Sequence, residues 1–122
     1  MGLHESAEMY LETIYVLSQK TGTVRSIDIA EHMGYSKPSV SRAVNLLKKG
    51  GYLTMAQDGY LSLTDEGREA AKKIFERHTV LSRFLALIGV SDEIAAKDAC
   101  KIEHVVSDET IVAIKAYIDK QN

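Results

Sequence analysis

Two short helices joined by a tight turn constrain the fold of this chain most. Ser26 is expected to cap a helix over Ile27–Met33, and Gly34 to end that helix in a left-handed conformation. Ser36 is expected to cap a second helix that runs to Lys49. A helix, a three-residue turn containing glycine and a second helix make the helix-turn-helix signature.

A β-hairpin is predicted directly after these helices. Apolar residues alternate over Tyr52–Ala56 and Tyr60–Leu63, on either side of Asp58-Gly59, which is a strong hairpin signal. A hairpin that follows a recognition helix makes a winged helix-turn-helix. Its tip is expected to touch DNA phosphates or the minor groove.

Amphipathic helices are predicted on both sides of this motif, so the fold class is mainly α. The first covers residues 5–19, and a long one runs from a Thr64 cap to about Ile88. A fifth begins at Ser91 and continues through Val106, and Ser107 caps the last. We expect a winged helix-turn-helix DNA-binding domain at 1–64 and a helical metal-binding and dimerisation domain at 65–122.

The long helix carries an apolar seam that favours a homodimer. The seam has 3-4-3-4-3 spacing, and most of it could pack within the chain, but a helix this long is also a good dimer element, and helix-turn-helix proteins commonly dimerise on palindromic DNA. Its members are Ala71, Ile74, His78, Leu81, Leu85 and Ile88. His78 interrupts this line, and a lone histidine on an apolar face is more often a hydrogen-bonded core residue than a ligand.

Positive charge collects on the second helix of the motif although the chain has a net charge of −2. No acidic residue lies between Tyr35 and Gly51. Arg42 is suited to guanine, the two serines to base edges or phosphate, and the lysines to phosphates. A solvated helix face is the alternative interpretation. The predicted contacts to double-stranded operator DNA are Ser36, Lys37, Pro38, Ser39, Arg42, Lys48 and Lys49.

Cysteine content and hydropathy indicate a cytoplasmic protein with a reduced thiol. One cysteine cannot form an intrachain disulfide, and the longest apolar run, Phe84–Ile88, is too short to span a bilayer. No charged and then apolar leader precedes Glu5. We expect no membrane partner and no organic cofactor.

Potential metal donors occur in two places. In a helix, Cys100, Glu103 and His104 stand at i, i+3 and i+4, so that a thiol, a carboxylate and an imidazole share one face. Met9 and Glu12 likewise share a face of the first helix. Ordinary packing is the competing interpretation, because free cysteine and methionine are common core residues.

Four segments together resemble the diphtheria-toxin-repressor family, which includes iron-dependent and manganese-transport regulators. They read EMYLETIY, SKPSVSRAV, RHTVLSRFL and DACKIEHVVSDE, and the resemblance spans essentially the whole chain. It implies that Met9, Cys100, Glu103 and His104 form the primary site of iron-type members, with the Cys100 carbonyl as a further ligand. Glu12 and His78 match the manganese-type members, where they complete a two-metal cluster.

Two departures from the iron-type pattern bear on metal stoichiometry. Ser82 and Ala96 stand where the ancillary iron-type site has a carboxylate and a histidine, so that site is expected to be absent in its usual form. The resemblance also implies a short form, without the third, SH3-like domain of many iron-type relatives. The number of metals for each subunit is therefore left open.

The function that these features predict is a metal-dependent repressor. Thiolate and thioether donors favour Fe(II), with Mn(II) as the alternative, while Ni(II), Co(II) or Zn(II) could bind in vitro. The rival classes are a winged-helix regulator that is metal-independent or responds to an organic ligand, and a pure interaction module. An enzyme that uses Cys100 and His104 is disfavoured, because residues at i and i+4 of a helix offer no preformed oxyanion hole.

Overall fold

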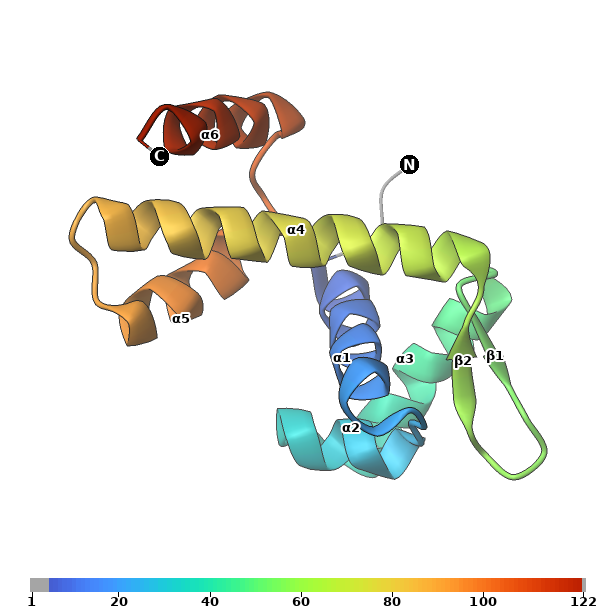
Figure 1. Cartoon of the computed structure of the whole chain (residues 1–122). Coiled ribbons are helices and arrows are strands. Elements are labelled where there is room, and N and C mark those ends of the chain that lie inside the picture. Colours follow the sequence, from blue (N-terminus) through green and yellow to red (C-terminus); the bar gives the residue numbers. More distant parts are fainter. Residues whose placement is uncertain (1–4, 122) are drawn as a thin grey trace. The chain divides into compact units, whose positions relative to one another are not determined.

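The computed structural model describes residues 5–121 and has two compact units, Met1–Lys72 and Lys73–Asn122. Six helices and one hairpin follow in the order α1, α2, α3, β1, β2, α4, α5, α6 (Figure 1). This confirms the predicted mainly helical, winged helix-turn-helix class. The division between the units falls inside α4, and the predicted domain boundary after Thr64 stays a prediction.

Three helices build the core of the N-terminal unit: α1 (Glu5–Thr21), α2 (Ser26–Met33) and α3 (Lys37–Lys49). Leu11 and Ile14 of α1 are fully buried, as the helical spacing predicted. They join apolar residues of the other two helices and of the hairpin in one cluster. Each such side chain contributes about 1.5–3 kcal/mol by leaving water.

The turn between α2 and α3 has the predicted chemistry. Gly34 adopts a left-handed conformation, with φ 72°, and its N–H donates to the carbonyl of Ala30. The Ser36 hydroxyl oxygen accepts a bond from the N–H of Ser39 at 3.4 Å and so caps α3. Both residues end helices at the positions that the sequence indicated.

The start of α2 corrects one prediction, because Ser26 is not the N-cap. Arg25 occupies that position, with extended backbone angles, and Ser26 is the first helical residue. The N–H of Arg25 donates to a carboxylate oxygen of Asp28 at 2.8 Å. The acidic side chain at the third helical position therefore accepts a bond from the backbone of the N-cap residue, which is one half of a capping box.

The wing consists of β1 (Leu53–Met55) and β2 (Leu61–Leu63), which pair antiparallel. Gly59 lies in the connecting turn with φ 89°, as expected of an Asp-Gly hairpin. The N–H of Leu61 also donates to the carbonyl of Val24 at 2.8 Å. This bridge joins the wing to the segment before α2, a pairing that the sequence did not predict.

The helix α4 (Asp65–Leu87) begins against the wing. The Thr64 hydroxyl accepts a bond from the N–H of Gly67 at 3.1 Å, which confirms the predicted cap. A Cβ on Gly67 would lie 2.0 Å from the carbonyl oxygen of Tyr52. Only glycine allows this close approach of the first turn of α4 to the backbone at Tyr52.

The C-terminal unit combines the second part of α4 with α5 (Asp92–Ile102) and α6 (Asp108–Gln121), which flank it in Figure 1. Its small apolar cluster takes one buried residue from each helix: Leu81, Ala99 and Ile111. Ser91 and Ser107 accept bonds from backbone N–H groups and cap α5 and α6 as predicted. Over residues 5–121, no helix is both long and apolar enough to cross a membrane.

Candidate metal centre and DNA-binding surface

Three predicted ligands of the C-terminal unit lie close together: the carboxylate of Glu103 and the imidazoles of His78 and His104. The Oε1 atom of Glu103 lies 3.4 Å from Nδ1 of His78 and 3.9 Å from Nε2 of His104. His78 comes from α4, while the other two belong to the connection between α5 and α6. The structure thus brings together two imidazoles and a carboxylate that are 26 positions apart in the chain at their widest.

The environment of Glu103 fits a divalent cation. The residue is 0% exposed, and within the described part of the chain neither carboxylate oxygen accepts a hydrogen bond. A buried ionised carboxylate without such bonds is costly, unless a positive charge lies beside it. Carboxylate oxygen and imidazole nitrogen are both donors that Mn, Fe and Zn ions accept in proteins.

The backbone around this cluster corrects the prediction that α5 runs on through Val106. The helix ends at Ile102, Glu103 is its C-cap, and a turn follows. The side chain of Arg77 on α4 donates hydrogen bonds to the carbonyl oxygens of Glu103 and Val106, at 3.1 and 2.7 Å. Because these carbonyls are satisfied from another helix, the chain can turn here and start α6.

The other predicted donors, Cys100, Met9 and Glu12, lie on two helices, α5 and α1. Cys100 is half-buried in the last turn of α5, one turn before Glu103. Met9 and Glu12 are half-buried on α1 of the N-terminal unit, on one face because they are three residues apart. Ser82 lies one turn after His78 on α4. Its buried hydroxyl oxygen has no hydrogen-bond partner among residues 5–121.

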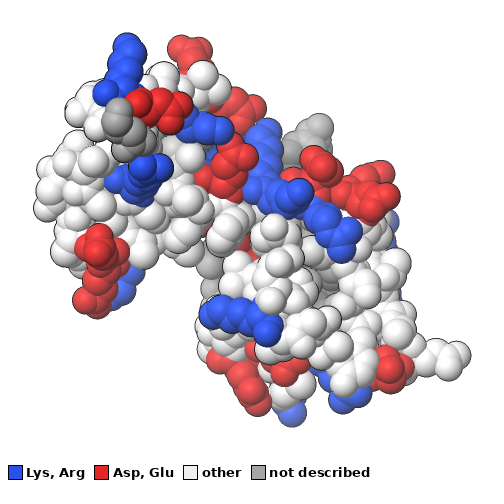
Figure 2. Space-filling view, in the orientation of Figure 1, with Lys and Arg blue, Asp and Glu red and all other residues white. Residues whose placement is uncertain are grey.

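The outer face of α3 carries the predicted DNA contacts. Ser36, Lys37, Pro38, Arg42, Lys48 and Lys49 are exposed, and Ser39 is half-buried. Val40, Val44 and Leu47 on the opposite face are buried in the core. Acidic and basic side chains are interspersed over the molecular face in Figure 2. The acid-free run on α3 is therefore a local feature of charge.

A tyrosine pair lies beneath Arg42. The rings of Tyr10 and Tyr35 are 6.0 Å apart, which joins α1 to the turn before α3. Burial raises the pKa of the Tyr10 hydroxyl, and Tyr35 adds to this, whereas the positive charge of Arg42 opposes it. The guanidinium is thus close enough to Tyr10 to influence its ionisation.

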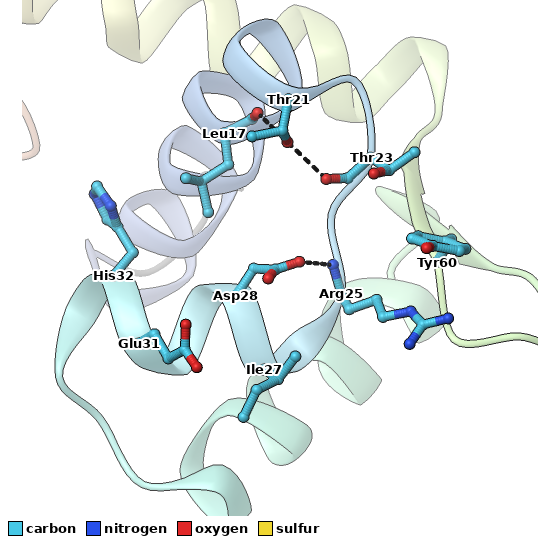
Figure 3. Close-up of a pocket in the computed structure, with 9 residues that line it drawn as sticks. All are labelled: Leu17, Thr21, Thr23, Arg25, Ile27, Asp28, Glu31, His32 and Tyr60. Carbon is cyan, nitrogen blue, oxygen red and sulfur yellow. Dashed lines mark hydrogen bonds between the residues drawn. The ribbon is translucent and has the colours of Figure 1, made fainter.

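Sequence patterns did not predict a second basic position, Arg25, beside the wing. Its guanidinium lies 4.3 Å from the centre of the Tyr60 ring, a cation–π arrangement. Both side chains line a surface pocket with residues of α1 and α2, including Asp28 and His32 (Figure 3). Because Arg25 and Tyr60 are far apart in sequence, no local pattern signals this contact.

Two family models match successive parts of the chain. Residues 2–61 match the iron dependent repressor, N-terminal DNA binding domain. Residues 64–121 match the iron dependent repressor, metal binding and dimerisation domain. The two matches place the helix-turn-helix in the first domain and the Glu103 cluster in the second.

Several curated proteins are similar over most of the chain. The transcriptional regulator MntR of Escherichia coli O6:H1 is 36% identical over 116 residues, which cover 95% of this chain and 75% of that protein. The iron-dependent repressor IdeR of Mycobacterium bovis is 37% identical over 108 residues, or 88% of this chain and 47% of that protein. These relatives are regulators of transcription and not enzymes.

Solved structures show the same architecture. A manganese-dependent transcriptional repressor in complex with manganese has a TM-score of 0.86 and 30% identity, over 93% of this chain and 52% of that chain. The manganese regulator SloR has a TM-score of 0.82 and 26% identity, over 98% and 55%. This chain thus spans about half the length of these structures. It belongs to the diphtheria-toxin-repressor family of metal-dependent transcriptional regulators.

Proposed function

We propose that this protein is a repressor that binds operator DNA as a homodimer when a divalent metal occupies the Glu103 cluster. The observation that carries the proposal is the buried Glu103 carboxylate, which accepts no hydrogen bond from residues 5–121 and faces two imidazoles. A site of this composition favours a cation over an organic ligand. The names of relatives such as MntR and IdeR support the same class of function.

The proposed ligands are His78, Glu103, His104 and Cys100 from the C-terminal unit, with Met9 and Glu12 from α1. The assignment of Cys100, Met9 and Glu12 rests on the family resemblance. A bound metal would supply positive charge to carboxylates that otherwise repel one another. Donors from both units would then couple metal binding to the geometry of the DNA-binding helices, so that metal and DNA each strengthen the binding of the other.

Fe(II) is the metal that this donor set favours. The thiolate of Cys100 and the thioether of Met9 are soft donors, which suit Fe(II) better than the harder Mn(II). Mn(II) is the second candidate, since His78, Glu103 and His104 are carboxylate and imidazole donors and similar solved structures include a manganese-dependent repressor. Ni(II), Co(II) and Zn(II) should bind at least as tightly in vitro by the Irving–Williams order.

The DNA-binding role is assigned to α3. We propose that Arg42 reads base edges, that Ser36, Pro38 and Ser39 enter the groove at the N-terminal end, and that the lysines contact phosphates. The homodimer would place two such helices in successive major grooves. The apolar side chains of α4 and α6 that line a groove in the C-terminal unit, among them Phe84, Ile114 and Tyr117, suit contact with a second copy.

The test is DNA affinity measured anaerobically with Fe(II), with Mn(II) and with chelator, on a duplex selected from a random pool in the presence of metal. We expect tight binding with metal and its loss with chelator. Glu103→Gln should abolish the metal response, while Glu109→Gln, an exposed acid on α6, should retain it. DNA binding that ignores chelator would overturn the proposal in favour of a metal-independent regulator, and stronger activation by Mn(II) would reverse the choice of metal.

A further inference from the structure

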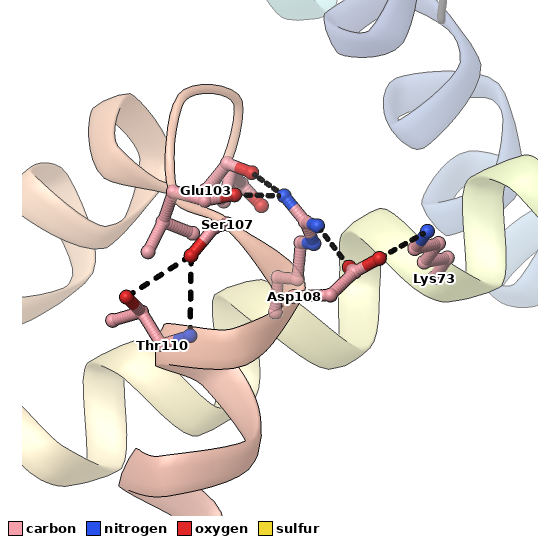
Figure 4. A network of polar contacts seen from close by, with 7 residues as sticks. Lys73, Glu103, Ser107, Asp108 and Thr110 are labelled. Atoms are coloured by element: carbon pink, nitrogen blue, oxygen red, sulfur yellow. Dashed lines mark hydrogen bonds and ion pairs between the residues drawn. The ribbon is translucent and has the colours of Figure 1, made fainter.

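Arg77 holds the connection between α5 and α6 by three interactions. Its Nη1 group donates to the carbonyl oxygens of Glu103 and Val106, at 3.1 and 2.7 Å. Its Nη2 group pairs with Oδ1 of Asp108, the first residue of α6. The same carboxylate reaches Lys73 through its other oxygen (Figure 4). One guanidinium thus fixes both ends of the turn that contains His104.

The interactions of Arg77 restrict the conformation of the connection between α5 and α6. The arginine side chain is 15% exposed, against 62% for Lys73, so its bonds are partly shielded from water. The Glu103 carbonyl lies at the C-terminal end of α5, where helices leave unsatisfied acceptors and favour positive charge, while the Val106 carbonyl lies in the turn before α6. A planar guanidinium can serve several acceptors at fixed angles, which a lysine ammonium cannot. The pKa of the Asp108 carboxyl is lowered, first by its bond to Arg77 and then by Lys73.

Arg77 and His78 both contact Glu103, Arg77 at its backbone carbonyl and His78 at its side-chain carboxylate. His78 faces the Glu103 carboxylate at 3.4 Å, and Arg77 binds the carbonyl of Glu103. The two contacting residues are consecutive on α4, so their relative positions are set by the helix. The Arg77 bond restrains the backbone of Glu103 at the position from which its carboxylate reaches His78.

We propose that Arg77 is a positioning residue of the metal centre, which orders Glu103 and His104 before metal binds. The inference rests on the proposed function, because it assigns a role towards the same site. Residues that orient metal ligands typically change metal affinity by 10- to 100-fold when they are removed. Arg77 would act in this way through the ligand backbone and not through a ligand side chain.

The matched comparison is Arg77→Met with Lys115→Met, each made in the full chain. Lys115 on α6 pairs with Glu76 on α4 at 2.6 Å, so it also joins these helices, but its bond goes to Glu76 and not to residues 103–106. Co(II) binding is measured by calorimetry and by the visible absorption of the bound ion, and thermal unfolding is measured without metal. We expect Arg77→Met to bind Co(II) roughly 10- to 100-fold more weakly and with an altered spectrum. Lys115→Met should keep the affinity and spectrum of the unmodified protein.

Arg77→Lys and Asp108→Asn complete the test. Each keeps part of the network, so each should bind Co(II) with an affinity between those of the unmodified protein and Arg77→Met; they also supply the answer if Arg77→Met does not fold. Unchanged Co(II) affinity and spectrum in the folded Arg77 variants, even with a lower unfolding temperature, would overturn the inference and leave a structural role only. If the unmodified chain does not bind Co(II), the proposed function fails and the inference fails with it.

Discussion

Different interactions stabilise the interior of each of the two compact units. In the N-terminal unit, one apolar cluster joins all three helices and the wing, with residues such as Leu11, Ile29 and Val40 completely buried. In the described part of the C-terminal unit, the corresponding cluster has Leu81, Ala99 and Ile111 at its buried centre, and Ile74, Ala95 and Ile118 are buried as well. Much of what orders the C-terminal unit is polar: the Arg77 network and the buried Glu103 cluster.

This difference suggests that the two units differ in how they respond to a bound cation. A core of buried apolar side chains forms without any ligand, so we expect the helix-turn-helix to be folded with or without metal. A buried carboxylate beside imidazoles is stable only when its charge is balanced, so its environment can respond to a cation. We therefore expect the first unit to depend on packing and the second on ligand and charge.

The largest effect should come from Gly67→Ala in the N-terminal unit. Alanine normally stabilises a helix relative to glycine by up to about 1 kcal/mol. Here the added Cβ would meet the Tyr52 carbonyl oxygen at 2.0 Å, so we expect a net loss of about 3 kcal/mol. Urea unfolding followed by circular dichroism measures it, with the exposed Glu69→Ala as the control. A more stable Gly67→Ala protein would contradict the packing described for this unit.

Metal should stabilise the C-terminal unit most directly. Mn(II) at about 100 times its dissociation constant should add about 2.7 kcal/mol to the free energy of unfolding. Hydrogen exchange should show the greatest new protection near Glu103–Val106, and little change for the buried face of α3. Glu103→Gln serves as the control, since it should show no added protection. Equal protection gains in both regions would remove the contrast between the units.

Arg42→Ala should separate DNA binding from metal binding. Loss of one base-reading arginine typically costs about 1–3 kcal/mol, or roughly 10- to 100-fold in affinity for the selected duplex. Metal affinity without DNA should stay unchanged, because Arg42 is exposed on α3 and is not among the proposed metal ligands. Lys97→Ala on α5 removes the same charge from the other unit and should affect DNA affinity much less. Similar losses in both variants would indicate a general charge effect.

The smallest effect concerns Asp108 and pH. Its pKa is lowered in the folded protein by Arg77 and Lys73, so its stabilising contribution is complete above the unfolded pKa of about 3.9. That contribution is lost as pH falls through the lower, folded pKa. Urea unfolding from pH 6 to the acid range should show a steeper decline for the unmodified protein than for Asp108→Asn. Parallel curves would show that this exposed carboxylate contributes nothing to the C-terminal unit.

Local signals in the sequence predicted most of the elements. Ser36, Thr64, Ser91 and Ser107 each begin a helix, and Asp58-Gly59 marks the wing, because caps and tight turns depend on residues within a few positions of one another. The periodicity of α1 likewise predicted that Leu11 and Ile14 are buried. Residue spacing already grouped Glu103 and His104 with Cys100 as metal donors, and His78 joined them through the family resemblance.

What the sequence did not predict depends on partners distant in the chain. The end of α5 at Ile102 follows from the bonds of Arg77, which lies 26 residues before Glu103. The need for glycine at position 67 follows from the Tyr52 carbonyl, and the Val24–Leu61 bridge joins a loop to the wing. The Ser26 error is different, because Asp28 accepts a bond from the backbone N–H of Arg25 and so favours a helix start one residue earlier. Propensity alone does not decide between two such neighbours.

The adjacency of Arg77 and His78 has a consequence for protein engineering. Because consecutive helical residues bind the carbonyl and face the carboxylate of Glu103, we expect the proposed metal-binding turn to work in another protein only together with this dipeptide. A graft of Cys100–His104 onto another helical scaffold would transfer these proposed ligands without Arg77 and His78, which contact Glu103. A transplanted site that includes the Arg-His pair at the matching helical register should bind metal where the bare turn does not.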